Sequence, residues 1–142
     1  MLLKVFIDES ADEKQKKAVA VGAFIGTSKQ WSSLKIKWFR RLALEGIQYF
    51  RSTEYYSLRG QFQKFRDPVK CPKPEGSKAA AKVRDDLETL IVSNELVGFA
   101  LCIRMDDWNS VLASDPQAWQ ILTNPFEIAT QLLISTMLPS GA

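Results

Sequence analysis

An apolar, strand-like segment opens the chain and ends at two adjacent acids. It covers residues 2–8, and Glu9 and Ser10 follow Asp8 directly. Because successive strand side chains alternate between two faces, the odd-numbered apolar residues share one face and Asp8 lies on the other. Asp8 is then expected to leave the sheet at its carboxyl edge, where open α/β sheets bind ligands. The alternative is that residues 8–10 only begin a polar turn, which Asp and Ser favour.

The rest of the pattern predicts a mixed α/β fold in a single domain, residues 1–142. Small and β-branched apolar residues at 18–26 predict a second strand that forms an antiparallel hairpin with the first. A parallel crossover is expected next, because a helix from Ser77 to about Asn94 leads into a strand at 96–105. The other predicted elements are a helix from residue 27 or 28 to about Glu45 before Gly46, a short strand at 47–50, and a helix from Asn124 through Met137 that Pro139 ends.

Composition narrows the chemistry that the chain can perform. It has 142 residues, of which 46% are hydrophobic, enough for one packed core. Histidine is absent from the sequence, which excludes His-based acid–base catalysis, Ser-His-Asp and Cys-His nucleophiles, and His-containing zinc sites. Cys71 in a Pro-flanked loop and Cys102 in an apolar strand make no disulfide framework, so reduced thiols are expected.

Since no apolar run approaches the roughly 20 residues of a membrane helix and no signal-peptide pattern is found, we expect a cytoplasmic protein with no membrane contact.

Positive charge and aromatic rings concentrate in one block of the chain. Residues 28–73 carry eleven Lys and Arg against three acids, so this block is +8 and the remainder −5. The same block holds nine of the fifteen aromatic residues, and interleaved cations and rings suit phosphate contacts and base stacking. Alternatively, Trp31, Leu34, Trp38 and Leu42 follow helical spacing and line the core, which leaves the cations between them on a solvated face.

Overlapping the end of that block, residues 51–76 are predicted to form an irregular basic and aromatic insertion that faces the substrate. Unpaired cations are rarely buried, so those of the insertion are expected to be exposed. Placed near a carboxylate site, they would hold a polyanion that the carboxylates repel. The candidate nucleic-acid contacts are Arg51, Arg59, Lys64, Arg66, Tyr55 and Tyr56.

A second pair of acids, Asp106 and Asp107, follows the predicted strand at 96–105. If this strand and the first strand are parallel neighbours, their carboxyl ends meet and Asp8 faces Asp106 or Asp107. Carboxylates held close together repel unless a cation joins them, and Mg²⁺ is held by one or two carboxylates, waters and substrate phosphate. Such an ion activates water and stabilises the departing oxygen in phosphodiester cleavage. The alternative is that these acids only cap a short segment at 108–112.

Three short motifs, spread over most of the chain, are similar to those of one protein family. They are V-F-I-D-E-S at Val5–Ser10, F-R-S-T-E-Y-Y at Phe50–Tyr56 and N-P-F-E at Asn124–Glu127. In this order they resemble the bacterial and phage domain-of-unknown-function family numbered 3800, which is regarded as having a ribonuclease H-like fold. The resemblance implies that Asp8 and Glu9 correspond to the first acidic pair of that family.

The resemblance further implies that Ser52 and Glu54 correspond to the family's Ser-x-Glu, with Asp106 as the candidate for an acid after a later strand. The chain departs from the family at Ala11, where a Gly is usual, and at Ala142, where family members usually continue into another strand with a further acid. We therefore expect a C-terminally incomplete chain. The exposed sheet edge of such a chain invites a second copy or a partner chain to cover it.

The predicted function is that of a ribonuclease H-like, divalent-metal-dependent nuclease, although an incomplete chain need not be active by itself. Its catalytic residues would be Asp8, Glu9, Glu54 and Asp106, of which Asp8, Glu54 and Asp106 would bind Mg²⁺ or Mn²⁺. The alternative is a non-catalytic nucleic-acid- or protein-binding module. In that module the acids are turn residues and the basic insertion contacts phosphates.

Overall fold

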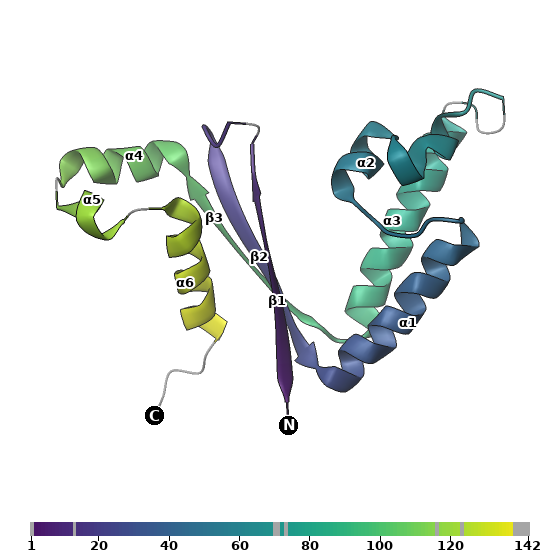
Figure 1. The fold of residues 1–142 in the computed structure, drawn as a ribbon, viewed down its shortest axis with the longest axis horizontal. Helices are drawn as coiled ribbons and strands as arrows, with labels where there is room; N and C mark the ends of the chain where they lie inside the picture. Colours follow the sequence, from purple (N-terminus) through teal and green to yellow (C-terminus); the bar gives the residue numbers. More distant parts are fainter. Residues whose placement is uncertain are drawn as a thin grey trace. The chain divides into compact units, whose positions relative to one another are not determined.

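The chain forms two compact units, each with its own core (Figure 1). One, here called the helical unit, comprises Gly26–Leu96 together with Leu2, and the other, the sheet unit, comprises Leu3–Ile25 and the residues from Val97 onward. This computed structural model describes residues 2–12, 14–69, 72, 74–115, 117–122 and 124–137.

A three-stranded antiparallel sheet is the centre of the sheet unit. Its strands β1 (Leu3–Ala11), β2 (Ala18–Thr27) and β3 (Val97–Arg104) lie side by side in that order. The first two form the predicted antiparallel hairpin, and the predicted mixed α/β class is confirmed (Figure 1).

The predicted parallel crossover is wrong, because β3 pairs with β2 and runs antiparallel to it. The register runs from Ala18 opposite Arg104 to Ile25 opposite Val97. After β2 the chain passes through the helical unit and re-enters the sheet at the end where it left. A return at the same end gives an antiparallel neighbour, as in a hairpin, whereas a crossover would carry the chain back to the opposite end.

Helix α6 (Pro125–Met137) packs against one face of the sheet, over β2 and β3. Val21 and Ala23 of β2 form a buried cluster with Ala129 and Leu133 of α6. The partners of these two β2 residues in β3, Leu101 and Phe99, pack against the same cluster. On the opposite face, small side chains occupy the middle of this strand pair, with Ala20 opposite Cys102 and Gly22 opposite Ala100.

The other helices of the sheet unit are α4 (Met105–Ser114) and α5 (Ala118–Ile121). At the start of α6 the Asn124 side chain accepts a hydrogen bond from the Phe126 N–H at 2.9 Å, so the predicted N-cap is confirmed. The predicted stop at Pro139 lies outside the described residues. In the described part of the chain, no helix is both long and apolar enough to cross a membrane.

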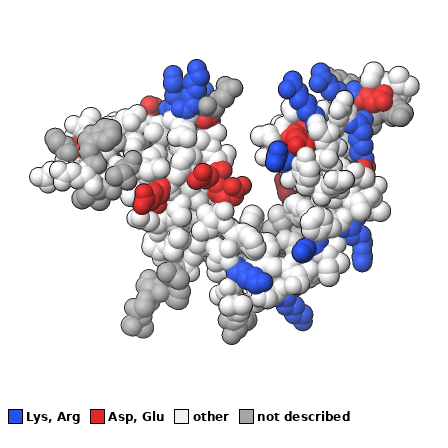
Figure 2. Space-filling model, in the orientation of Figure 1, with Lys and Arg blue, Asp and Glu red and all other residues white. Residues whose placement is uncertain are grey.

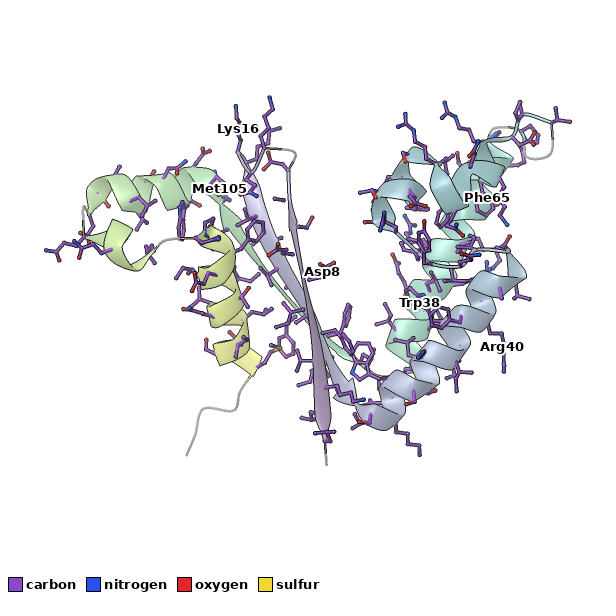
Figure 3. The ribbon with its side chains drawn as sticks, viewed as in Figure 1. Asp8, Lys16, Trp38, Arg40, Phe65 and Met105 are labelled. Atoms are coloured by element: carbon purple, nitrogen blue, oxygen red, sulfur yellow. The ribbon has the colours of Figure 1, made fainter. Side chains whose placement is uncertain are left out.

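In its described residues, the helical unit packs two long helices and two short ones around an aromatic core. The long α1 and α3 contact each other, and α3 and α2 both contact the 3₁₀ helix η1. Trp38 from α1 and Phe65 from η1 both lie in this unit (Figure 3). The bounds are α1 Ser28–Leu44, α2 Ser52–Ser57, η1 Gly60–Arg66 and α3 Glu75–Ser93. The buried core residues are Leu42, Ile47, Phe62, Phe65, Ala80, Val83 and Leu87.

Local signals in the sequence explain where α1 begins and ends. Thr27 and Gln30 form a capping box, in which the Thr27 hydroxyl accepts from the Gln30 N–H and the Gln30 side chain accepts from the Thr27 N–H. At the other end Gly46 has φ +63°, a left-handed conformation that suits glycine after a helix. Both predicted helix boundaries are therefore confirmed.

Two predictions between α1 and α3 differ from the structure. Residues 47–50 do not form a strand, because Ile47 is buried in the helical core and its N–H donates to the Leu42 carbonyl at 3.0 Å, closing the end of α1. Residues 51–76, predicted to be irregular, contain α2, η1 and the first turn of α3. Their helical structure depends on contacts with residues that are distant in sequence, such as the ion pair between Lys64 of η1 and Glu45.

Candidate nucleic-acid interface

The first two predicted catalytic acids lie within β1 rather than beyond its end. β1 continues to Ala11, so Asp8 and Glu9 are neighbouring strand residues whose side chains project to opposite faces of the sheet. Both are exposed, and the Asp8 carboxylate accepts a hydrogen bond from the Glu9 N–H at 3.0 Å. Figure 3 shows Asp8 part-way along the strand. The prediction that the strand ends at Asp8 is wrong, because pairing with β2 continues through the polar residues.

The turn that ends β1 is organised instead by Asp12. Its carboxylate accepts hydrogen bonds from the N–H groups of Lys17 at 2.8 Å, Ala18 at 3.1 Å and Lys16 at 3.1 Å. These bonds, that of Lys17 foremost, lower the pKa of Asp12 from 3.8 to about 2. Asp12 therefore closes the hairpin as a carboxylate.

The later acids lie in the first turn of α4, after β3. Asp106 and Asp107 are exposed, and the Asp107 carboxylate lies 3.8 Å from the Arg104 guanidinium. Because β2 lies between the outer strands, the backbones of β1 and β3 are two strand spacings apart, about 10 Å. The prediction that Asp8 meets Asp106 or Asp107 at the ends of neighbouring strands is therefore wrong. Among the residues described, no group of three or more Asp, Glu, Cys or His side chains could hold a metal ion.

Glu54 belongs to the helical unit and organises the turn between α2 and η1. Its carboxylate accepts from the Gln61 N–H at 2.9 Å and from the Tyr49 hydroxyl at 3.1 Å, with the Arg51 guanidinium 3.8 Å away. The side chain is 17% exposed. Gly60 has φ +52°, and a Cβ there would overlap this carboxylate. Glu54 is thus held as an acceptor within its own unit.

A concave surface of the helical unit lies over α2, η1 and the start of α3. Three adjoining hollows, of about 730, 430 and 160 Å³, share Leu58. We call the combined surface the basic groove. Its polar and charged lining includes Tyr55, Tyr56, Ser57, Arg59, Gln63, Lys64, Arg66, Asp67 and Ser77.

Two arginines of the basic groove are available to an anionic ligand. Arg59 and Arg66 are exposed, line both larger hollows, and form no ion pair with an acid in the described part of the chain. Figure 2 shows Lys and Arg side chains gathered on the helical unit near α2. These arginines confirm the expected exposure, and Arg51 is likewise exposed, at 67% of its side chain.

Lys64 differs from the two arginines because it has a structural partner. Its ammonium lies 2.9 Å from the Glu45 carboxylate and also donates to the Glu45 carbonyl. Hydrogen bonding to Lys64 is the main reason that the pKa of Glu45 lies below its ordinary value. Lys64 therefore joins η1 to the end of α1 as well as lining the groove.

Two adjacent tyrosines of α2 have different environments. Tyr55 packs in the core against Phe50 and Phe62, with ring centroids 5.6 Å away in each case, and the Arg84 guanidinium lies 5.6 Å from its ring. Tyr56 is 78% exposed and lines the groove beside Tyr55, their centroids 4.9 Å apart. Tyr56 is thus the accessible ring of the two, and it packs against Tyr55, which the core holds in place.

The sequence did not indicate the complete lining of the basic groove. Ser77, predicted as the N-cap of a helix, lies inside α3, which begins at Glu75, and contributes to the groove. Gln63 and Leu58 also line it. Leu58 has the left-handed φ of +47° at the end of α2, a conformation that a leucine rarely adopts and that the sequence therefore did not indicate. Their grouping results from packing, which leaves no local pattern.

Comparisons with protein-family models, with curated proteins and with solved structures give no match for this chain. The similarity to the family numbered 3800 stays a prediction that depends on the three motifs at 5–10, 50–56 and 124–127. The basic groove and the acids of β1 and α4 are therefore interpreted from their own geometry.

Proposed function

We propose that the helical unit binds single-stranded nucleic acid through the basic groove. The observation that carries this proposal is the convergence of Arg59 and Arg66, neither paired with a described acid, on a hollow beside the exposed ring of Tyr56. Cations that follow a backbone and an aromatic ring on which a base stacks are the two components of single-strand binding sites. A hollow of about 730 Å³ is within the range of roughly 300–1,000 Å³ found for ligand sites.

The proposal predicts a specific decrease in salt dependence. We expect Arg59→Ser with Arg66→Ser to weaken binding of a fluorescent oligothymidine or oligouridine and to reduce the slope of log K against log salt. The reduction should be roughly 1.4, which is about 0.7 for each phosphate of a single strand that the variant no longer neutralises. Fluorescence anisotropy at several salt concentrations measures this slope.

The matched control removes the same charge from a different surface of the helical unit. Lys29 and Lys35 are exposed cations of α1 and do not line the basic groove. Lys29→Ser with Lys35→Ser should leave the slope close to that of the wild type. Tyr56→Ala should weaken binding without changing the slope, because a ring contributes stacking and no charge. Equal slopes for the two double variants would mean that Arg59 and Arg66 do not contact phosphates and that the proposal is wrong.

Metal-dependent phosphodiester cleavage in a ribonuclease H-like fold is the second candidate function. The observation that favours it is the exposure of Asp8, Glu9 and Asp106 in one unit, where none forms an ion pair with a cation of the described residues. Asp8 would be the central ligand of Mg²⁺ or Mn²⁺, because one or two carboxylates and waters suffice for such ions. The bound ion would activate water.

This second candidate predicts a metal response that depends on Asp8. Mg²⁺ or Mn²⁺ should raise the melting temperature, since a ligand that binds only the folded chain stabilises it by mass action. Asp8→Ala should abolish the increase, whereas Glu88→Ala, which removes an exposed acid of α3, should retain it. Differential scanning calorimetry with and without metal tests both variants. An undiminished response in Asp8→Ala would exclude Asp8 as a ligand.

A further inference from the structure

β1 presents a long and apolar edge in the described part of the sheet. It is the outermost strand, next to β2 only, and all nine of its residues are exposed. Leu3 is 50% exposed, Phe6 60% and Val5 42%. Proteins usually shorten, charge or cover such an edge, because its free N–H and C=O groups pair readily with another strand. A strand of this kind is suited to extending its sheet with a second strand.

The sequence of β1 is complementary to itself at one register. Two copies related by a twofold axis perpendicular to the sheet pair antiparallel, and residues on the same face become opposite one another. With the axis at Phe6, Lys4 of each copy lies opposite Asp8 of the other, and Val5 lies opposite Ile7. Opposite charges and β-branched residues at facing positions each stabilise a strand pair.

Neighbouring registers lack this match. An axis at residue 4 or residue 8 sets two like charges against each other, which destabilises a strand pair. An axis at residue 5 or residue 7 places Asp8 opposite the apolar Leu2 or Phe6. Charge complementarity therefore selects the register centred on Phe6, in which Leu3 faces Glu9 near the strand ends.

We propose that β1 is a homodimer interface, in which two copies of the chain pair antiparallel about Phe6 and join their sheets into one. The Lys4–Asp8 pairs flank the two Phe6 rings on one face, while Val5 and Ile7 lie on the other. The interaction is a strand addition in which main-chain hydrogen bonds supply affinity and the two charge pairs fix the register. It is independent of the basic groove, which belongs to the helical unit.

A charge exchange tests both the dimer and its register. In sedimentation velocity experiments on the full chain with EDTA, the wild type should be a dimer in the micromolar range. Asp8→Lys leaves Lys4 facing a lysine, and Lys4→Asp leaves Asp8 facing an aspartate. Each variant alone should therefore dissociate, with a dimer Kd raised about tenfold or more because two attractive pairs become repulsive.

Mixing the two variants restores attraction at both pairs, so the mixture should again sediment as a dimer. The double variant Lys4→Asp with Asp8→Lys should dimerise by itself for the same reason. These two results cannot come from misfolded variants, because both contain the same substitutions that separate the single variants. A monomeric wild type across the micromolar range, or dimers unaffected by the single substitutions, would overturn the proposal. Failure of both the mixture and the double variant to associate would overturn it as well.

Discussion

Asp12 shows how a single carboxylate can determine a connection between strands. Three N–H groups donate to it across the turn, and this lowers its pKa to about 2. Glu45 and Asp86 also have pKa values below their ordinary range, chiefly through hydrogen bonds from Lys64 and Arg41. Glu45 and Asp86 join segments that are separate in sequence, and we expect protonation of the three carboxylates to weaken the turn and these helix contacts.

The pH dependence of stability follows from the sign of the Asp12 shift. A carboxyl group whose pKa is lower in the folded state stabilises the fold fully above its unfolded value of 3.8. That contribution is lost as the pH falls from about 4 through about 2. Asp12→Asn should therefore reduce stability at neutral pH and flatten its decline over this interval. Urea midpoints at several pH values would show this.

The control for that measurement is Glu88→Gln, which removes an exposed carboxylate of α3 far from the hairpin in sequence. It should preserve the decline below pH 4, of which Glu45 and Asp86 also contribute part. A wild-type slope in Asp12→Asn would show that the hairpin does not depend on this ionisation.

At the level of elements, the sequence predicted what local chemistry determines. The start of α1 at Thr27 and its stop before Gly46 were predictable because the capping groups are adjacent to the helix. Asn124 marked α6 in the same way. The strand neighbours were not predictable, because a strand at 97–104 could pair with either earlier strand and only packing decides. Of the candidate site, exposure of Arg59 and Arg66 followed from charge, but the groove around them required the α2–η1 turn.

That turn can be tested through the contact between Glu54 and Gly60. Glu54→Ala should lower the free energy of unfolding by about 1–3 kcal/mol, because the Gln61 N–H and Tyr49 hydroxyl lose their acceptor. Gly60→Ala should also destabilise, since its φ is +52° and its Cβ would overlap the Glu54 carboxylate. Denaturant titration gives both values.

A double-mutant cycle distinguishes this contact from two unrelated defects. In Glu54→Ala with Gly60→Ala the overlapping carboxylate is gone, so the combined destabilisation should be smaller than the sum of the two single effects. Glu88→Ala combined with Gly60→Ala is the matched control and should be additive. Additivity in the first pair would contradict the packing of Glu54 against Gly60.

At the scale of the whole molecule, the two cores share no buried residue among those that the structure describes. The core around Phe62 and Val83 belongs to the helical unit, and the core around Val21 and Leu133 belongs to the sheet unit. The helical unit is continuous in sequence from Gly26, whereas the sheet unit is assembled from two separate stretches. The sequence predicted a single domain, because composition alone carries no sign of this division.

The pairing of Ile25 with Val97 joins residues on either side of the helical unit, and this suggests an order of folding. Bringing these residues together in an unfolded chain closes a loop as long as the whole helical unit, and the entropy cost grows with loop length. A helical unit that folds first shortens this loop before the sheet forms. We therefore expect pulse-labelled hydrogen exchange during refolding to protect Val83 and Leu87 before Val21, with simultaneous protection contradicting this order. Formation of the sheet thus depends on the helical unit, whose described residues between β2 and β3 include no strand. A substitution deep in the helical core would therefore slow the formation of β-structure.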